Sequence, residues 1–142
     1  MSFDLMVFEP SAAPRTRAEF MRWYQEQAEW SEDHSYDDPA VTSPALQNWF
    51  AEMIQYFPPL NGPLAVGDDR VDDLTVTDHC IGRNVIYSAF RWDAANEAFD
   101  KMRELAIKHG VGFFHASDDE GEILFPGNGT LAKTHRPWWK IW

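Results

Sequence analysis

The stretch Phe3-Asp4-Leu5-Met6-Val7-Phe8 is apolar at almost every position. Successive side chains of a strand point to opposite faces, so this stretch places apolar side chains on both faces. A strand of this kind is covered on both sides in a folded protein. We therefore expect a central strand at about residues 2–9, around which the rest of the chain is arranged.

The first helix is expected directly after this strand and a short connector. Thr16 and Glu19 have the spacing of a capping box, and apolar residues at helical spacing follow them. This pattern predicts a helix over about 17–30. The next segment, 31–43, is acidic, contains a proline and has no periodicity, so it is expected to be a surface loop.

A second helix is predicted where this loop ends. Ser43 is a suitable cap and Pro44 suits the first helical position, and an apolar helical pattern then runs to about Tyr56. Residues 58–67 contain three prolines and two glycines, which cannot continue a helix or a central strand. This segment is expected to cross irregularly from a helical half to a β half.

The second half of the chain begins with a predicted hairpin. Leu74, Val76 and the threonines beside them read as a strand, residues 81–83 as a turn, and 85–90 as the partner strand. β-branched and aromatic residues dominate both stretches. We therefore expect these two strands to pair antiparallel.

A third helix and a second hairpin are predicted to follow. Asp93 is the expected cap of the helix, and Gly110 is its expected stop because glycine adopts the left-handed conformation at least cost. Residues 111–116 and 122–125 are the expected strands of the hairpin, joined by an acidic turn. The expected inner stripe of the helix consists of Ala95, Phe99, Met102, Leu105 and Ala106.

These elements give the order β-α-α-β-β-α-β-β, which predicts an α+β fold with three helices on a mainly antiparallel sheet of about five strands. At 142 residues and 44% hydrophobic composition, the chain is the size of one ordinary domain with a packed core. The C-terminal tail, 130–142, differs because basic residues alternate there with Trp138, Trp139 and Trp142. We expect the tail to pack back on the single domain 1–142 and bury these rings.

Negative charge is concentrated in one third of the chain. The formal net charge is -11, and no Lys or Arg occurs between Arg22 and Arg70. Nine acids fall in the same interval: Glu26, Glu29, Glu32, Asp33, Asp37, Asp38, Glu52, Asp68 and Asp69. A surface of one sign repels nucleic acid and anionic membranes and attracts cationic partners. The charge pattern therefore predicts no nucleic-acid or membrane partner, and it fits either a solubilising loop or a docking face for a basic protein.

Compartment and cofactors are constrained by what the sequence does not contain. Cys80 is the only cysteine, so neither an intramolecular disulfide nor a zinc-thiolate cluster is expected. No apolar run has the ~20 residues of a membrane span, and the acidic start does not resemble a signal peptide. His34, Asp37 and Asp38 share a loop but not a known ligand spacing. We expect a cytoplasmic protein without metal or cofactor.

Catalytic candidates are weak in this sequence. His79 and Cys80 are adjacent, yet neighbours in a strand point to opposite faces and cannot act together as base and nucleophile. No catalytic residue is assigned on this basis. The alternative of a small-molecule-binding enzyme would depend on His79 and His115 together with Asp78 in one pocket.

Several motifs resemble a small family of bacterial single-domain proteins. They are MSFDLMVFEP at 1–10, FPPLNGP at 57–63, DHCIG at 78–82, VGFF at 111–114 and DEG at 119–121. The similarity extends over nearly the whole chain, and its motifs carry no known chemistry. Members of this family resemble the immunity proteins that accompany polymorphic or type VI secreted toxins. The resemblance implies a protein that binds and neutralises a cognate toxin domain.

The charge pattern and this resemblance lead to one prediction for the partner-binding residues. An acidic face accelerates association with a basic toxin domain, and aromatic anchors supply affinity. The expected contacts are Trp30, Glu32, Asp33, Tyr36, Asp37 and Asp38. A structural or interaction subunit, such as a homodimer that uses its tryptophans as an exposed patch, is the other alternative beside the enzyme.

Overall fold

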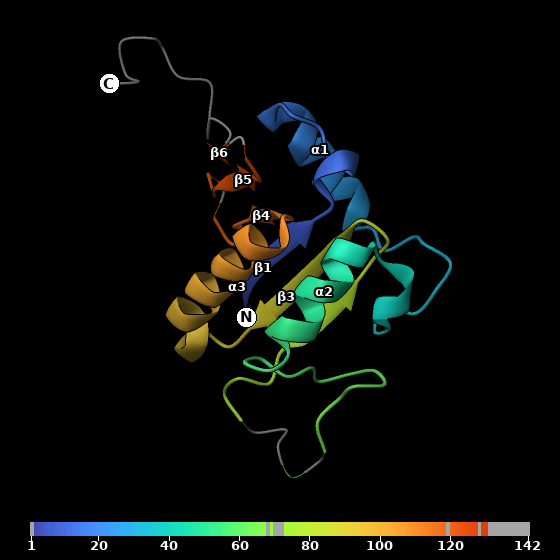
Figure 1. The fold of residues 1–142 in the computed structure, drawn as a ribbon, viewed down its shortest axis with the longest axis vertical. Coiled ribbons are helices and arrows are strands. Elements are labelled where there is room, and N and C mark those ends of the chain that lie inside the picture. Colours follow the sequence, from blue (N-terminus) through green and yellow to red (C-terminus); the bar gives the residue numbers. More distant parts are fainter. Residues whose placement is uncertain (1, 68, 70–72, 119, 128, 131–142) are drawn as a thin grey trace.

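The protein folds into one sheet with helices on both faces (Figure 1). The computed structural model describes residues 2–67, 69, 73–118, 120–127 and 129–130. The elements are β1 (Phe3–Phe8), α1 (Arg17–Gln27), α2 (Pro44–Met53), β2 (Asp78–Ile81), β3 (Val85–Phe90), α3 (Ala95–His109), β4 (Gly112–Phe114), β5 (Ile123–Phe125) and β6 (Gly129–Thr130). Short 3-10 turns are η1 (Pro10–Ala12), η2 (Pro39–Val41) and η4 (Trp92–Ala94). The α+β prediction is confirmed.

The strands form a single antiparallel sheet in the order β2-β3-β1-β4-β5-β6. β1 lies inside the sheet, where Val7 is opposite Ile86 of β3 on one side and Phe113 of β4 on the other. The predicted element order and the central position of the first strand are therefore confirmed. The structure adds β6, a two-residue strand at the edge.

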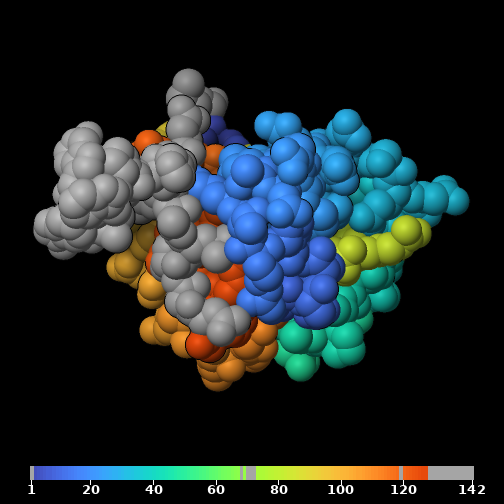
Figure 2. Space-filling model, turned by 90° about the horizontal axis from the view of Figure 1, so that it is seen from above, coloured from blue at the N-terminus to red at the C-terminus, as the bar shows by residue number. Residues whose placement is uncertain are grey.

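Each face of the sheet has its own apolar core. Leu5 and Val7 of β1 pack with α2 and α3, which lie side by side over one face in Figure 1. Met6 and Phe8 pack on the opposite face with Phe20 of α1. Figure 2 shows α1 and the residues around it as a blue region in the centre of the molecule. Alternate residues of one strand thus hold helices on both sides.

Three of the four predicted helix-end residues are confirmed. The Thr16 hydroxyl accepts a hydrogen bond from Glu19 N at the start of α1, and Ser43 accepts one from Leu46 N at the start of α2. Gly110 ends α3 with a φ of 70°. The predicted cap Asp93 is wrong, because η4 occupies residues 92–94 and makes Ala94 the cap, without a side-chain bond.

The predicted strand at Leu74 and Val76 is also wrong. Leu74 is exposed in a turn, and β2 begins only at Asp78. The cause is the Asp73 carboxylate, which accepts hydrogen bonds from both Thr75 N (2.9 Å) and the Thr75 hydroxyl (2.7 Å). A local bond of this kind bends the backbone away from an extended conformation.

Two predicted helices end earlier than expected, and one prediction lies outside the described residues. α1 stops at Gln27 and α2 at Met53, and single turns replace the last three predicted residues of each. The expected packing of the tail 130–142 concerns residues that the structure does not describe beyond Thr130.

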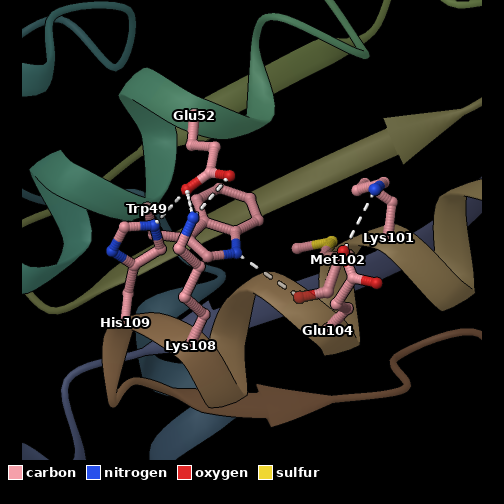
Figure 3. A network of polar contacts seen from close by, with 7 residues as sticks. All are labelled: Trp49, Glu52, Lys101, Met102, Glu104, Lys108 and His109. Carbon is pink, nitrogen blue, oxygen red and sulfur yellow. Dashed lines mark hydrogen bonds and ion pairs between the residues drawn. The ribbon is translucent and has the colours of Figure 1, made fainter.

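The contact between α2 and α3 combines a buried ring with a charged network (Figure 3). Trp49 is fully buried and donates its indole N–H to the Met102 carbonyl at 3.4 Å. Glu52 accepts hydrogen bonds from Lys108 Nζ and His109 Nε2, each at 2.8 Å to the same oxygen. The bonds from Lys108 and then His109 lower the pKa of Glu52. Lys108 also lies at the C-terminal end of α3, where the helix dipole favours positive charge.

Replacing Gly112 with alanine should destabilise the fold. Gly112 lies opposite Phe8, and a Cβ atom at this position would overlap the fully buried Phe8 ring. We expect Gly112→Ala to lower the free energy of unfolding by about 1–3 kcal/mol, as overpacking does elsewhere. Urea unfolding measured by circular dichroism gives this value.

Gly82→Ala is the matched control for that variant. The nearest side-chain atom to a Cβ at Gly82 is Val85 Cγ2 at 3.4 Å, an ordinary contact. Equal unfolding energies for the two variants would contradict the steric role assigned to Gly112.

Candidate functional site

The six residues predicted to bind a partner lie on one segment between α1 and α2, which we call the contact loop (residues 30–38). This loop packs against the turn that joins β2 to β3. Ile81 N donates a hydrogen bond to the Tyr36 carbonyl at 2.8 Å, and Arg83 N donates one to Glu32 Oε1 at 3.0 Å. The contact loop is therefore held in place by the sheet.

Trp30 and Tyr36 form the aromatic part of the contact loop. Their ring centroids are 5.1 Å apart in an edge arrangement, and Trp30 also contacts Tyr87 of β3 at 6.0 Å. The Tyr36 hydroxyl accepts a hydrogen bond from Glu32 N at 2.7 Å. Both rings are partly exposed, so they shape the loop and still offer surface to a partner.

The four predicted acids of the contact loop have different roles. Asp38 caps η2 by accepting a hydrogen bond from Ala40 N at 2.9 Å, and Asp37 accepts one from the Ser35 hydroxyl at 2.9 Å. Asp33 is exposed and makes no side-chain hydrogen bond with the part of the chain that the structure describes. A partner can therefore engage Asp33 without breaking a bond inside the protein.

Glu32 is bound to His34 inside the contact loop. His34 Nε2 lies 2.5 Å from Glu32 Oε1, and His34 Nδ1 lies 2.6 Å from the Ser35 carbonyl. Both partners are acceptors, which favours the doubly protonated imidazolium. The hydrogen bond to Ser35 and then that to Glu32 raise the pKa of His34. Part of the Glu32 charge is thus balanced locally.

A hollow of about 390 Å³ lies where α1 meets the contact loop. We call it the acidic hollow. Its lining residues are Glu26, Gln27, Glu29, Ser31 and Glu32. Three carboxylates border it, and none of the lining residues carries a positive charge. The hollow therefore presents acceptors and suits a cationic donor.

The end of α1 beside the acidic hollow has unfavourable local features. Glu26 and Glu29 lie at the C-terminal end of the helix, where the dipole disfavours negative charge, and the last turn contains no basic residue. Gln27 Oε1 is buried without a hydrogen-bond partner among the described residues. Trp30 has a φ of 51°, the one positive value among the described non-glycine residues. Such costs concentrate at functional sites.

Glu26, Gln27 and Glu29 were not among the predicted contacts. Glu26 and Glu29 fall in the acidic interval, at the end of the first predicted helix, but the expected contacts were limited to residues from Trp30 onward. The absence of any Lys or Arg from the end of that helix was the signal in the sequence. An acidic helix end opposes the usual preference for cations, and this points to a role other than helix stability.

His79 and Cys80 lie on opposite faces of the sheet, as their adjacency in a strand predicts. His79 is buried against the α2 side, where its Nε2 donates to the Phe57 carbonyl at 2.9 Å and its Nδ1 accepts from the Ser88 hydroxyl at 2.7 Å. Burial lowers the pKa of His79 to about 4. Burial, followed by the charge of Asp78, raises the pKa of Cys80 to about 11, so its thiol remains protonated.

The structure does not bring His79 and His115 together. His115 follows β4 and contacts Phe3 and Phe99, with ring centroids 5.4 Å and 5.3 Å away. Two strands, β3 and β1, lie between β2 and β4 in the sheet. The pocket that an enzyme based on these two histidines requires is therefore not formed by them.

Metal sites and membrane-spanning helices are two other kinds of feature that the described residues could contain. Nowhere among them do three His, Cys, Asp or Glu side chains come together as a metal site requires. No helix in the described part of the chain is both long and apolar enough to cross a membrane.

Comparisons of the chain with protein-family models, curated proteins and solved structures find no match. The resemblance to immunity proteins therefore stays a prediction. The acidic hollow and the contact loop are the features from which a function can be argued.

The buried His79 should make the fold sensitive to acid. The unfolded chain binds a proton on this side chain near pH 6.5, whereas the folded protein does so only near pH 4. The unfolded state therefore binds more protons between these values, and stability falls as the pH decreases from 6.5 to 4, by up to about 3 kcal/mol. Urea unfolding at several pH values measures this slope.

His79→Gln removes the titrating imidazole. The slope of the unfolding free energy against pH should then decrease by up to ~1.4 kcal/mol per pH unit, the value for one proton. Ser88→Ala retains the buried imidazole and should keep the slope of the original protein. An unchanged slope in His79→Gln would show that other groups cause the acid sensitivity.

Proposed function

We propose that this protein is an inhibitory binding module that engages a basic protein partner with the acidic hollow and the contact loop. The finer proposal is that the partner is a secreted bacterial toxin domain and that this chain is its immunity protein. The observation that carries the first statement is the acidic hollow, which offers three carboxylates to a cation.

A lysine or arginine side chain is the occupant that fits the acidic hollow. The carboxylates of Glu26, Glu29 and Glu32 can accept hydrogen bonds from such a cation. Gln27 also lines the hollow, and its Oε1 is a buried acceptor without a partner among the described residues. A buried acceptor that gains a donor recovers the cost of its desolvation. Charge-assisted bonds between a cationic side chain and carboxylates are about twice as strong as neutral ones.

Long-range electrostatics support the same surface. No Lys or Arg occurs between Arg22 and Arg70, so both the acidic hollow and the contact loop belong to a segment that lacks these two residue types. A field of one sign raises the association rate with an oppositely charged protein by about 10–1000-fold at low salt. The distribution of charge therefore favours fast capture of a basic partner.

The contact loop supplies a second element of a tight interface. The loop is tied to β2 through the Tyr36 carbonyl and to the turn after β2 through the Glu32 carboxylate, so little ordering is needed on binding. Trp30 and Tyr36 remain partly exposed, and tryptophan and tyrosine are common anchors of binding energy. An inhibitor gains affinity from such a preformed surface.

The immunity proposal adds a biological role to this binding. Many toxin domains that act on nucleic acids or nucleotides have cationic clefts, and an acidic surface that covers such a cleft blocks it. The motifs at 1–10 and 57–63 that resemble an immunity-related family support the same role. No catalytic group of this chain is needed for it.

Removal of three charges should slow binding of the partner. The partner is first captured from native cells with the tagged protein and identified by mass spectrometry. We expect Glu26→Gln, Glu29→Gln and Asp33→Asn together to lower the association rate about tenfold at low salt, with a smaller difference at high salt. Surface plasmon resonance at several salt concentrations measures the rate.

A control variant removes the same charge from another surface. Glu97→Gln, Asp100→Asn and Glu104→Gln change exposed residues of α3 and should leave the rate near that of the original protein. Equal rates for the two triple variants would contradict the proposed site. If the captured partner does not kill cells that lack this chain, the immunity proposal fails and the binding site is still tested.

A further inference from the structure

A second hollow of about 440 Å³ lies at the other end of β3 from the contact loop. We call it the Trp92 hollow. Its lining residues are Phe3, Trp92, His115, Ser117 and Asp118. The contact loop packs at the start of β3 and Trp92 follows its end, so the six residues of β3 separate them by about 20 Å. The Trp92 hollow is thus a distinct surface.

Trp92 is unusually exposed for its size. It belongs to η4, between β3 and α3, and 53% of its surface is accessible. Its ring packs on Phe3 with centroids 5.1 Å apart and an angle of 57° between the planes. A large aromatic ring that is fixed on one side and open on the other is a typical anchor for a partner.

The walls of the Trp92 hollow are held by the sheet and by a turn. Ser117 Oγ accepts a hydrogen bond from Asp4 N at 2.6 Å, and Ser117 N donates one to the Asp4 carbonyl at 3.0 Å. Asp118 Oδ1 accepts a hydrogen bond from Glu120 N at 3.0 Å. The His115 ring is packed between Phe3 and Phe99. The hollow is therefore formed before any ligand binds.

The chemistry of the Trp92 hollow combines aromatic rings with a carboxylate. The face of an indole ring attracts cations more strongly than that of other side chains, and arginine is the cation found there most often. A planar guanidinium can stack on Trp92 and bond to Asp118 in the same pose, which a compact ammonium cannot do.

The surrounding charge favours a cation as well. The turn beside Trp92 contains Asp118 and Glu120, and the sequence places Asp119 between them. Arg17 interacts with Asp118 and Glu120 and donates a hydrogen bond to the Gly121 carbonyl at 2.9 Å. Asp118 and Glu120 therefore share the cation Arg17, and these three described side chains together keep a net negative charge.

We propose that the Trp92 hollow is a second recognition site, which receives an arginine side chain of a protein partner between Trp92 and Asp118. The site does not depend on the acidic hollow, and it can be tested without knowledge of the partner. An arginine peptide is a sufficient probe because the recognised group is one side chain.

The test is a titration of the ¹⁵N-labelled protein with the peptide acetyl-Gly-Arg-Gly-amide, followed by nuclear magnetic resonance. The matched peptide carries citrulline, which has the shape of arginine without its charge. We expect saturable shifts at the Trp92 indole and at Phe3, Ser117 and Asp118, with a dissociation constant on the order of 1–10 mM. The citrulline peptide should bind at least about fivefold more weakly.

Variants of Trp92 and Asp118 test whether these two side chains bind the arginine peptide. Trp92→Ala should abolish the shifts at Phe3 and Ser117, and Asp118→Asn should weaken binding while retaining the acceptor for Glu120 N. Ile107→Ala removes another exposed apolar side chain and should leave the binding of the arginine peptide unchanged. Equal binding of the citrulline peptide, a response that persists in Trp92→Ala, or no saturable shift would overturn the proposal.

Discussion

Burial of β1 on both of its faces is the constraint on which the rest of the structure depends. Leu5 and Val7 require cover on one side of the sheet, and Met6 and Phe8 require it on the other. A strand with these demands must lie inside the sheet, and helices must reach both faces. α1 therefore covers one face while α2 and α3 cover the other, and the acidic segment between α1 and α2 crosses beside the β2–β3 turn.

Most helix ends carry residues that stabilise the helix, whereas the end of α1 carries residues that destabilise it. The start of α1 is capped by Thr16, the start of α2 by Ser43 and the end of α3 by Gly110. Lys108 places a cation at the negative end of α3. The end of α1 does the reverse, with carboxylates at its negative end, a strained Trp30 and a buried amide oxygen that has no partner among the described residues. Natural proteins accept such costs where a surface is used for binding. The contrast within one chain supports the acidic hollow as a binding site.

Periodicity and capping residues were sufficient to predict most of the fold. The two-faced pattern of 3–8 predicted the central strand, and the residues at Thr16, Ser43 and Gly110 predicted three helix ends. The errors arose where a short-range contact decided the backbone. The Asp73 side chain turns the chain where β-branched residues predicted a strand, and η4 moves the start of α3 beyond Asp93.

The candidate sites could be predicted only in part. The interval without Lys or Arg indicated the contact loop, because net charge is visible in composition. The involvement of Glu32 with His34 and the capping role of Asp38 could not be read from the sequence, because each depends on a turn geometry. The Trp92 hollow joins the first strand to residues 115–118, and such a distant contact leaves no local pattern.

Hydrogen bonds at its base hold the two ends of the crossing between α2 and β2 together. Thr77 N donates a hydrogen bond to the Pro58 carbonyl, and Leu60 N donates one to the Thr77 carbonyl. The His79 ring donates a third to the Phe57 carbonyl. These bonds fix the two ends of the segment side by side, independently of the chain between them. Doubling the length of a closed loop costs only about 0.6 kcal/mol, so this segment can accept inserted sequence. A peptide epitope or a small reporter domain grafted directly after Val66 would be carried at the opposite end of the molecule from α1 (Figure 1), with the sheet intact.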